Sequence, residues 1–254
     1  MSTLLAKLHD AILTISLNRP ERANAFNFEM LHALQAALDQ AAADRQIRCV
    51  ILTGSGENFC AGHDVSEMLA AQGGEVSYQK HLQETYNPLI LQIRELELPV
   101  VAAVNGPVAG AGLGIALACD LRLAADTASF TVGFSGIGLV PDSGVSLLLP
   151  ALIGLGRATE YTFTNQPITA EQALKWGLVN RVVPEAKLPS ETRRVAAGLA
   201  RGPIGAFGLT KRLFNRTMLP DLAEALELES ELQEVASKAK EHADGVKRFL
   251  EKRK

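Results

Sequence analysis

Aromatic residues and cysteine are scarce in this sequence, and their scarcity argues against two classes of protein. Phe, Tyr and Trp make up 5% of the 254 residues, and the formal net charge is −3. Single-stranded nucleic acids bind proteins through aromatic stacking and positive charge, so we expect no nucleic-acid partner. Cys49, Cys60 and Cys119 are odd in number and widely spaced. They argue against a disulfide framework and favour a reducing cytoplasm.

The sequence also lacks the marks of a secreted or membrane-spanning chain. Its N-terminal segment, MSTLLAKLHD, contains no long apolar run and no small-residue cleavage site. The uncharged run from Pro99 to Cys119 contains two prolines and four glycines, which interrupt it too often for a spanning helix. The histidines outside residue 63 are scattered singly, which gives no pattern for a metal site. We therefore expect a cytoplasmic protein with no membrane partner and no metal.

Charge is nearly absent from one long stretch. The segment from Leu98 to Gly156 holds only four charged side chains, which are Asp120, Arg122, Asp126 and Asp142. Charged residues are rarely buried, so a stretch without them belongs to the interior of the protein. With 47% apolar residues, the chain can bury a sizeable core as one large domain. Asp142 is then a lone carboxylate in apolar surroundings.

Short apolar segments and amphipathic segments alternate between Ala11 and Val183, which predicts an α/β core. Strands are expected at residues 11–17, 50–53, 100–104, 121–125, 130–132 and 179–183. Helices are expected at residues 28–43, 76–96, 111–118, 170–177, 188–200, 203–214 and 221–237. The last helices carry apolar stripes, which pack either on a partner subunit or back on the same domain.

Residues 59–65, FCAGHDV, are the first segment with a candidate chemical role. A strand enters a glycine-containing turn there, and backbone N–H groups at such a turn are exposed donors. One interpretation is an oxyanion-binding donor near His63. The other is a plain turn in which Asp64 caps the following helix.

Residues 105–114, NGPVAGAGLG, form the second segment and again join a buried strand to a helix N-terminus. Its small residues let a ligand approach the backbone closely, or let the helix pack tightly on the sheet. The segment is not the dinucleotide fingerprint, because the glycine order differs and no ribose-binding acid follows about 20 residues later. It also lacks the lysine of a phosphate-binding loop.

Residues 138–144, GLVPDSG, form the third segment and contain Asp142. Proline, aspartate, serine and glycine are typical of turns and helix caps, so Asp142 is a candidate N-cap for a helix starting at Ser143. It is also a candidate general base or nucleophile, because apolar surroundings raise the pKa of a carboxyl group towards values useful for proton transfer.

Several blocks together resemble the enoyl-CoA hydratase/isomerase, or crotonase, superfamily over nearly the whole chain. They are NRP with NA at residues 18–25, FCAG at 59–62, AAVNG at 102–106, CD at 119–120 and WGLV at 176–179. The resemblance implies an α/β spiral of repeated ββα units, residues 1–195, with a C-terminal helical oligomerisation region, residues 196–254. It also implies a homotrimer or a dimer of trimers.

The resemblance further implies an acyl-CoA thioester substrate, with coenzyme A as part of the substrate and no separate cofactor. The thioester oxygen would lie in an oxyanion hole formed by the backbone N–H groups of His63 and Ala111. The candidate CoA-binding residues are Arg22, Ala23, Ala25, Ala61, Asp64, Val65, Phe249 and Lys252. For the last two, reaching the CoA of a neighbouring subunit and lying in a solvated helix end are both open.

The sequence departs from the hydratases of that family at their two catalytic glutamates. Those positions hold Gly114 and Phe134, which cannot move a proton. Dienoyl-CoA isomerases and 4-chlorobenzoyl-CoA dehalogenases resemble this chain in placing an acid at Asp142. The run 134–142 is most similar to ring-1,2-epoxyphenylacetyl-CoA isomerases, although Val145 replaces a glycine common there.

We therefore expect an isomerase that shifts a double bond, or isomerises a ring epoxide, with Asp142 as its single acid/base. Phe134, Ile137 and Leu139 would line the acyl pocket. Three alternatives stay open at this point. They are a hydratase with non-standard residues, a dehalogenase-like enzyme in which Asp142 attacks an aryl ring, and a non-catalytic CoA-binding relative.

Overall fold

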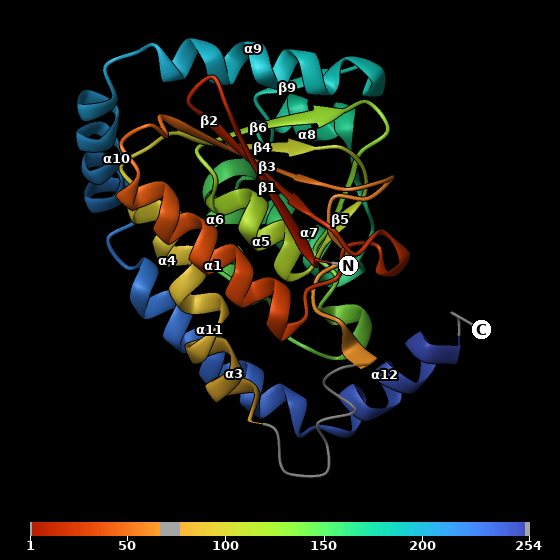
Figure 1. The fold of residues 1–254 in the computed structure, drawn as a ribbon. Helices are drawn as coiled ribbons and strands as arrows, with labels where there is room; N and C mark the ends of the chain where they lie inside the picture. Colours follow the sequence, from red (N-terminus) through yellow and green to blue (C-terminus); the bar gives the residue numbers. More distant parts are fainter. Residues whose placement is uncertain (1, 67–76, 252–254) are drawn as a thin grey trace.

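The main sheet of the protein has six strands in the order β1-β2-β3-β4-β6-β9 (Figure 1). The computed structural model describes residues 2–66 and 77–251. β1 pairs with β2 antiparallel, and the later strands pair in parallel. The strands are β1 (Leu4–His9), β2 (Ile12–Leu17), β3 (Cys49–Gly54), β4 (Val100–Val104), β6 (Leu121–Ala125) and β9 (Arg181–Val183).

A second, three-stranded sheet gives the chain its repeating path. It consists of β5 (Val108–Ala109), β7 (Ser129–Thr131) and β8 (Ile168–Thr169). β4 and β6 lie in the large sheet, whereas the next strand after each, β5 and β7, lies in the small one. Helices follow each pair. This alternation is the expected spiral of ββα units.

Helices cover the large sheet on both faces. α9 crosses one face and contacts β2, β3, β4 and β6, while α1 packs on β1 and β2 and contacts α4 (Figure 1). The helices of the core are α1 (Phe28–Ala43), α3 (Tyr78–Glu84), α4 (Tyr86–Glu95), α5 (Ala111–Ala118), α6 (Val145–Ile153), α7 (Leu155–Thr164), α8 (Ala170–Trp176) and α9 (Leu188–Ala200). Short 3-10 turns occur at η1 (Pro20–Arg22), η3 (Ser135–Ile137) and η4 (Glu185–Lys187).

The charge-poor stretch forms the centre of the molecule. Every residue of β4 and every residue of α5 is buried. α5 packs so closely that a β-carbon at Gly112 would lie 2.7 Å from the β-carbon of Cys60. The expectation that this stretch is interior is confirmed for β4 and α5, where the lack of charge follows from the cost of burying ions, but it was wrong for the end of the stretch, where Leu155 is 72% exposed.

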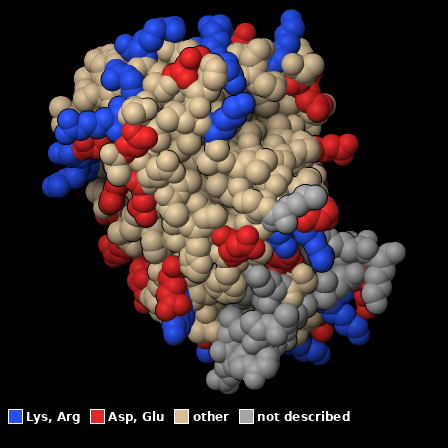
Figure 2. All heavy atoms as spheres, viewed as in Figure 1, with Lys and Arg blue, Asp and Glu red and all other residues tan. Residues whose placement is uncertain are grey.

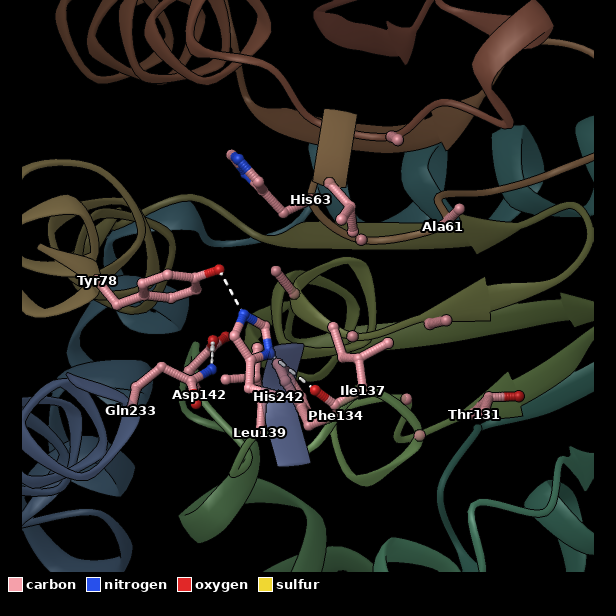
Figure 3. Close-up of a pocket in the computed structure, with 18 of the residues that line it drawn as sticks. Ala61, His63, Tyr78, Thr131, Phe134, Ile137, Leu139, Asp142, Gln233 and His242 are labelled. Atoms are coloured by element: carbon pink, nitrogen blue, oxygen red, sulfur yellow. Dashed lines mark hydrogen bonds between the residues drawn. The ribbon is translucent and has the colours of Figure 1, made fainter. Parts of the chain in front are cut away.

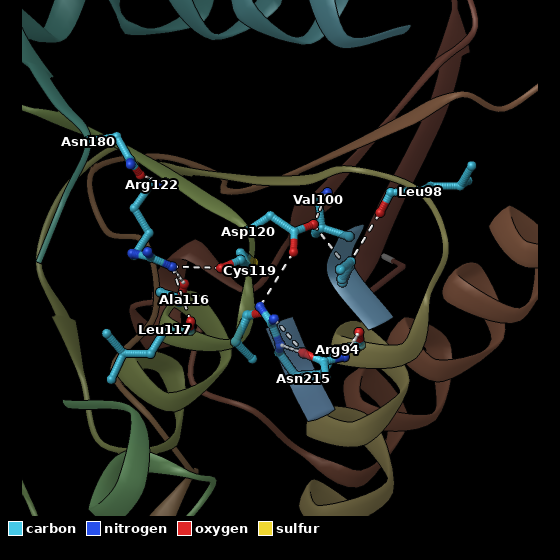
Figure 4. A network of polar contacts seen from close by, with 12 residues as sticks. Arg94, Leu98, Val100, Ala116, Leu117, Cys119, Asp120, Arg122, Asn180 and Asn215 are labelled. Carbon is cyan, nitrogen blue, oxygen red and sulfur yellow. Dashed lines mark hydrogen bonds and ion pairs between the residues drawn. The ribbon is translucent and has the colours of Figure 1, made fainter. Parts of the chain in front are cut away.

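Two of the four charged residues in this stretch, Asp120 and Arg122, are engaged by polar partners (Figure 4). The Asp120 carboxylate accepts hydrogen bonds from the Val100 N–H at 2.8 Å and from the Lys211 ammonium at 2.9 Å, and forms an ion pair with Arg94 at 3.4 Å. Arg122 donates to backbone carbonyls at the end of α5. Through Arg94 and Lys211, Asp120 therefore connects α4 and α10 to the start of β6.

Three C-terminal helices follow the core: α10 (Ile204–Met218), α11 (Leu222–Ser237) and α12 (Lys240–Glu251). α10 and α11 expose large apolar side chains, namely Leu209, Leu213, Phe214, Met218, Leu228, Leu232 and Val235. The expected boundary after residue 195 falls inside α9, which contacts the sheet.

Two expected helices were wrong in their extent, because the one expected at 203–214 is α10 and runs to Met218, and the one expected at 76–96 is divided; several elements were not expected. Within the described residues, the segment expected as one helix at 76–96 forms α3 and α4, which meet at Thr85; residue 76 lies outside them. Pro88 explains the break, because it has no N–H for the Glu84 carbonyl and its ring would clash there. β1, β5, α7 and β8 were not among the expected elements.

Charges of both signs surround a largely uncharged centre on the face seen in Figure 2, with lysine and arginine most frequent near α9. No helix among residues 2–66 and 77–251 is long and apolar enough to cross a bilayer.

Candidate active site

The three segments with candidate chemical roles meet at one cavity of about 690 Å³ (Figure 3). Its walls come from the 61–65 turn, α3, the start of α5, the 131–142 segment, α11 and α12. Most lining side chains are apolar or small. His63, Ala111 and Asp142, one from each of the three segments, all line it.

The residues expected to supply the two backbone N–H donors, His63 and Ala111, both lie at this cavity. Gly62 has φ 93°, and a β-carbon placed on it would lie 3.6 Å from the Ala111 nitrogen. The Ala109 N–H donates to the Cys60 carbonyl at 2.9 Å and joins the two segments. Among the described residues, the structure gives no hydrogen-bond acceptor to the N–H of His63 or of Ala111. Ala111 also opens α5, where the helix dipole favours negative charge.

Asp142 is buried, with 6% of its surface exposed, and both of its oxygens accept hydrogen bonds. The Ser143 hydroxyl donates to Oδ1 and the Gln233 amide donates to Oδ2, each at 2.7 Å. The Gln233 amide cannot turn over, because its oxygen accepts from the Val140 N–H at 3.0 Å. Burial raises the pKa of Asp142 to about 7, and the nearby Glu229 charge adds to the rise. The carboxyl group can therefore gain and lose a proton near neutral pH.

The expectation that Asp142 caps a helix starting at Ser143 was wrong. The helix, α6, begins at Val145, and its N-cap is Gly144. Ser143 and Gly144 both have positive φ, of 56° and 78°, which turns the chain between Asp142 and the helix. Glu229 of α11 supplies the acceptors instead, at 2.8 Å from the Gly144 nitrogen and 2.9 Å from that of Ser146. Asp142 is thus left to face the cavity.

Comparisons with known proteins identify the family. The family model described as enoyl-CoA hydratase/isomerase matches residues 7–254. The chain belongs to the enoyl-CoA hydratase/isomerase family. It is 37% identical over 254 residues to the 1,2-epoxyphenylacetyl-CoA isomerase of Escherichia coli K12, covering 100% of this chain and 97% of the relative. It is 40% identical over 251 residues to a probable enoyl-CoA hydratase of Rhodobacter capsulatus, covering 99% and 96%.

Solved structures confirm the crotonase fold. An enoyl-CoA hydratase from Mycobacterium avium subsp. paratuberculosis K-10 superposes with a TM-score of 0.88 at 33% identity, covering 99% of this chain and 97% of that one. The protein is accordingly a crotonase-superfamily enzyme of the hydratase/isomerase kind, and family members bind acyl-CoA thioesters. Both hydratases and isomerases occur among its relatives.

The resemblance places the two glutamates of family hydratases at Gly114 and Phe134. At Gly114 the backbone leaves no room for a side chain. A β-carbon at Gly114 would lie 2.4 Å from the Ser143 carbonyl oxygen and 2.7 Å from its β-carbon. Phe134 lines the cavity, as do Ile137 and Leu139, the other residues expected in the acyl pocket. Asp142 is the only carboxylate among the described residues that line this cavity.

The residues expected to bind CoA separate into two groups. Ala25, Ala61 and Val65 line the cavity. The others are not among its lining residues: Arg22 and Ala23 lie at η1, and Asp64 pairs with Arg19 at 2.9 Å. Lys252 lies outside the described residues, and so does the side chain of Phe249.

The side chain of His63, a residue of which only the backbone N–H had an expected role, contacts cavity residues that the sequence did not indicate. The His63 ring contacts the Tyr86 hydroxyl at 2.9 Å and lies 4.8 Å from the ring of His81. Burial lowers the pKa of His63 to about 3 and that of His81 to about 4, so both rings are neutral. Tyr78, Gln233 and His242 line the cavity as well. They come from helices whose spacing gave no sign that they reach the site.

Proposed function

We propose that the protein is an acyl-CoA isomerase that shifts a carbon–carbon double bond, with Asp142 as its single acid/base. The position of the Asp142 carboxyl group is the main support for this proposal. It lines the cavity, is held through both oxygens, and burial raises its pKa to about 7. A group that titrates near the working pH is suited both to take and to return a proton.

The reaction follows from these positions. The thioester oxygen of a 3-enoyl-CoA accepts hydrogen bonds from the N–H groups of His63 and Ala111. Asp142 takes a proton from carbon 2, the C–H bonding electrons form a dienolate, and negative charge moves onto the thioester oxygen. Donors in fixed positions stabilise that charge, each by about 3 kcal/mol. Asp142 then returns the proton to carbon 4, which gives the 2-enoyl-CoA with all atoms conserved.

Hydration of a double bond is disfavoured by the other residues of the site. Adding water to a double bond needs one group to activate the water and another to deliver a proton to carbon. Gly114 and Phe134 supply neither, and His63 and His81 are too weakly basic, with pKa values of about 3 and 4. With a ring epoxide as substrate, Asp142 would assist ring opening at the same place. The 37% identity to an isomerase of that type supports this as the second candidate.

The experiment compares the wild type with Asp142→Asn on 3-hexenoyl-CoA. Loss of a general acid/base lowers rates by about 10²- to 10⁴-fold, and we expect a fall of that size in kcat. Asp126→Asn is the matched control, because Asp126 accepts from the Glu185 N–H at 3.0 Å and does not line the cavity. Full activity of Asp142→Asn, or rapid hydration of crotonyl-CoA by the wild type, would contradict the proposal.

The assembly is also a proposal. We infer a homotrimer, or a dimer of trimers, in which the region expected to oligomerise, residues 196–254, contributes the exposed faces of α10 and α11. One side of α11 packs on its own core through Leu226, Ser230 and Gln233. The opposite side exposes Leu228 and Leu232 together with the apolar residues of α10. Burying such a patch supports association. Light scattering coupled to size exclusion tests it, and a monomer would contradict it.

The CoA contacts remain proposals as well. The residues proposed to hold the CoA moiety are Arg22, Ala23, Ala25, Ala61, Asp64 and Val65, with Phe249 and Lys252. Arg22 is exposed and close in sequence to the cavity-lining Ala25, so its charge is available to a phosphate group. Asp64 is the least suited, since its carboxylate is engaged by Arg19 and Ser66.

A further inference from the structure

A second polar pair lies in the same cavity as Asp142 and has no part in the proton transfer described above. Tyr78 of α3 and His242 of α12 both line the cavity. The Tyr78 hydroxyl lies 2.9 Å from Nε2 of His242, and Nδ1 of His242 lies 2.8 Å from the Ile137 carbonyl oxygen. His242 is 8% exposed, and its ring meets that of Tyr78 edge to face.

The Ile137 contact fixes the direction of both hydrogen bonds. A carbonyl oxygen only accepts, so Nδ1 of His242 carries the hydrogen. In neutral His242, Nε2 is then an acceptor and takes the hydrogen of the Tyr78 hydroxyl. Among the described residues, His242 is the only hydrogen-bond partner of that hydroxyl. The Tyr78 oxygen can therefore accept from a ligand but has no hydrogen left to donate.

Close packing holds His242 in place. α12 lies against η3, where a β-carbon at Gly245 would be 2.8 Å from the Ile137 backbone. A β-carbon at Gly138 would be 2.7 Å from the backbone of α12 at Glu241. Glycine at both positions lets the two backbones meet. The orientation of the His242 ring is thus set before any ligand binds, as a recognition group requires.

The pair lies at the acyl end of the cavity. Tyr78 and His242 share one side of the cavity with Asp142 and Gln233, whereas Ala61 and Thr131 lie toward the other end (Figure 3). Under the proposed function, Asp142 contacts the reacting carbons of the acyl group. The side of the cavity that holds Tyr78 and His242 then receives the acyl carbons beyond the double bond. The CoA moiety leaves toward the end that holds Ala61.

We propose that this enzyme selects acyl-CoA thioesters whose acyl group carries a hydroxyl, which donates its hydrogen bond to the Tyr78 oxygen. The proposal rests on the function proposed above and names the substrate class of that site. A purely hydrocarbon acyl group would cover the Tyr78 oxygen without giving it a partner, and such loss of solvation weakens binding. A ketone or ether oxygen would face another acceptor and gain nothing.

Discrimination of this kind is measurable. A site that pairs with a substrate hydroxyl rejects the analogue without it much more strongly than an apolar pocket rejects a change of one methylene group. We expect at least about tenfold higher kcat/KM for the hydroxyl substrate than for the methyl analogue, because Tyr78 is half-buried and its oxygen is already bonded on one side. A ketone in the same place should be no better than methyl.

The substrates are 3-enoyl-CoAs of matched size that carry a hydroxyl, a methyl or a ketone at carbon 5, 6 or 7. The assay runs at about pH 8 throughout. Tyr78→Phe removes only the acceptor oxygen and should abolish the hydroxyl preference. Tyr161→Phe is the matched control, because its hydroxyl contacts Gln172 at 3.2 Å and does not line the cavity. That variant should keep the preference.

A second variant tests whether the Tyr78 hydroxyl donates its hydrogen to His242. His242→Phe leaves the Tyr78 hydroxyl free to donate, so the ketone should improve relative to the methyl analogue by several-fold. Equal turnover of hydroxyl and methyl substrates by the wild type at all three carbons would overturn the proposal. So would a preference that survives in Tyr78→Phe, or a ketone that equals the hydroxyl in the wild type.

Binding separates this proposal from the proposed function. Saturated hydroxyacyl-CoA and acyl-CoA pairs cannot isomerise, and calorimetry gives the ratio of their Kd values. A hydroxyl preference in Kd that Tyr78→Phe removes supports the inference even where no 3-enoyl-CoA is turned over, which would defeat the isomerase proposal alone. Equal Kd values for every pair would overturn the inference while leaving isomerase activity untouched.

Discussion

Replacing Asp142 by asparagine should stabilise the protein at alkaline pH. The carboxyl group has a pKa of about 7 in the folded protein, against an ordinary value of 3.8. Below pH 3.8 it is protonated in both the folded and the unfolded state. Between pH 3.8 and 7 the folded state holds a proton that the unfolded state has lost, so stability falls as pH rises. Above pH 7 the loss is complete.

The size of the effect follows from the shift. Each pKa unit corresponds to about 1.4 kcal/mol, so the wild type should lose about 4 kcal/mol relative to Asp142→Asn between pH 4 and pH 8. Asparagine fits the site, because its oxygen can still accept from Gln233 while the Ser143 hydroxyl turns to accept from its amide. The variant therefore removes the titration without leaving a polar atom unpaired.

Urea denaturation at fixed protomer concentration and several pH values measures this difference. Titrating groups that do not interact with Asp142 are shared by the two proteins and cancel, whereas Glu229, whose charge acts on Asp142, contributes part of the difference. Asp126→Asn serves as a control for replacement of a carboxylate outside the cavity. Parallel stability curves for wild type and Asp142→Asn from pH 4 to 8 would refute the reasoning, because they would mean that folding does not shift the Asp142 pKa.

Three further changes have expected outcomes. Gly114→Ala should cost about 1–3 kcal/mol in urea denaturation, because its methyl group would meet the Ser143 carbonyl at 2.4 Å; unchanged stability would contradict that packing. Glu229→Gln should move the pH midpoint of kcat/KM downward, because the Glu229 charge helps to raise the Asp142 pKa, and a fixed midpoint would exclude that coupling. His81→Phe should reduce the loss of stability on acidification from about pH 6.5 to 4 by up to about 1.4 kcal/mol per pH unit. The buried imidazole has a pKa of about 4 and stays neutral over this range, whereas the unfolded chain binds a proton there; an unchanged slope of stability against pH would contradict this.

Much of the fold could be predicted from the sequence where burial and periodicity agree. The helices at residues 28–43, 111–118 and 188–200 and the strand at 121–125 have the expected bounds. The first strand, β1, could not be predicted, because it lies at the sheet edge with all of its residues after Leu4 exposed and shows no alternation. The break between α3 and α4 at Thr85 was not predicted either. Pro88, which causes it, lies three residues later, inside α4.

The site could be predicted only in part. Asp142 stood out because charge is scarce around it, and the turn segments 59–65 and 105–114 stood out through their glycines. Gln233 and Glu229 gave no local signal. Their roles, holding Asp142 and capping α6, exist only because α11 folds back on the 138–146 segment. Contacts between residues so distant along the chain come from packing, which a single sequence does not reveal.

The destination of one hydrogen tests the central claim most directly. 3-Hexenoyl-CoA with deuterium at carbon 2 is converted in ordinary water, and the product is analysed at carbon 4. If Asp142 alone carries the proton, its burial slows exchange with solvent, and a substantial fraction of the deuterium should appear at carbon 4. Efficient conversion with no deuterium at carbon 4 would mean that water or another group delivers the proton, and would contradict the account.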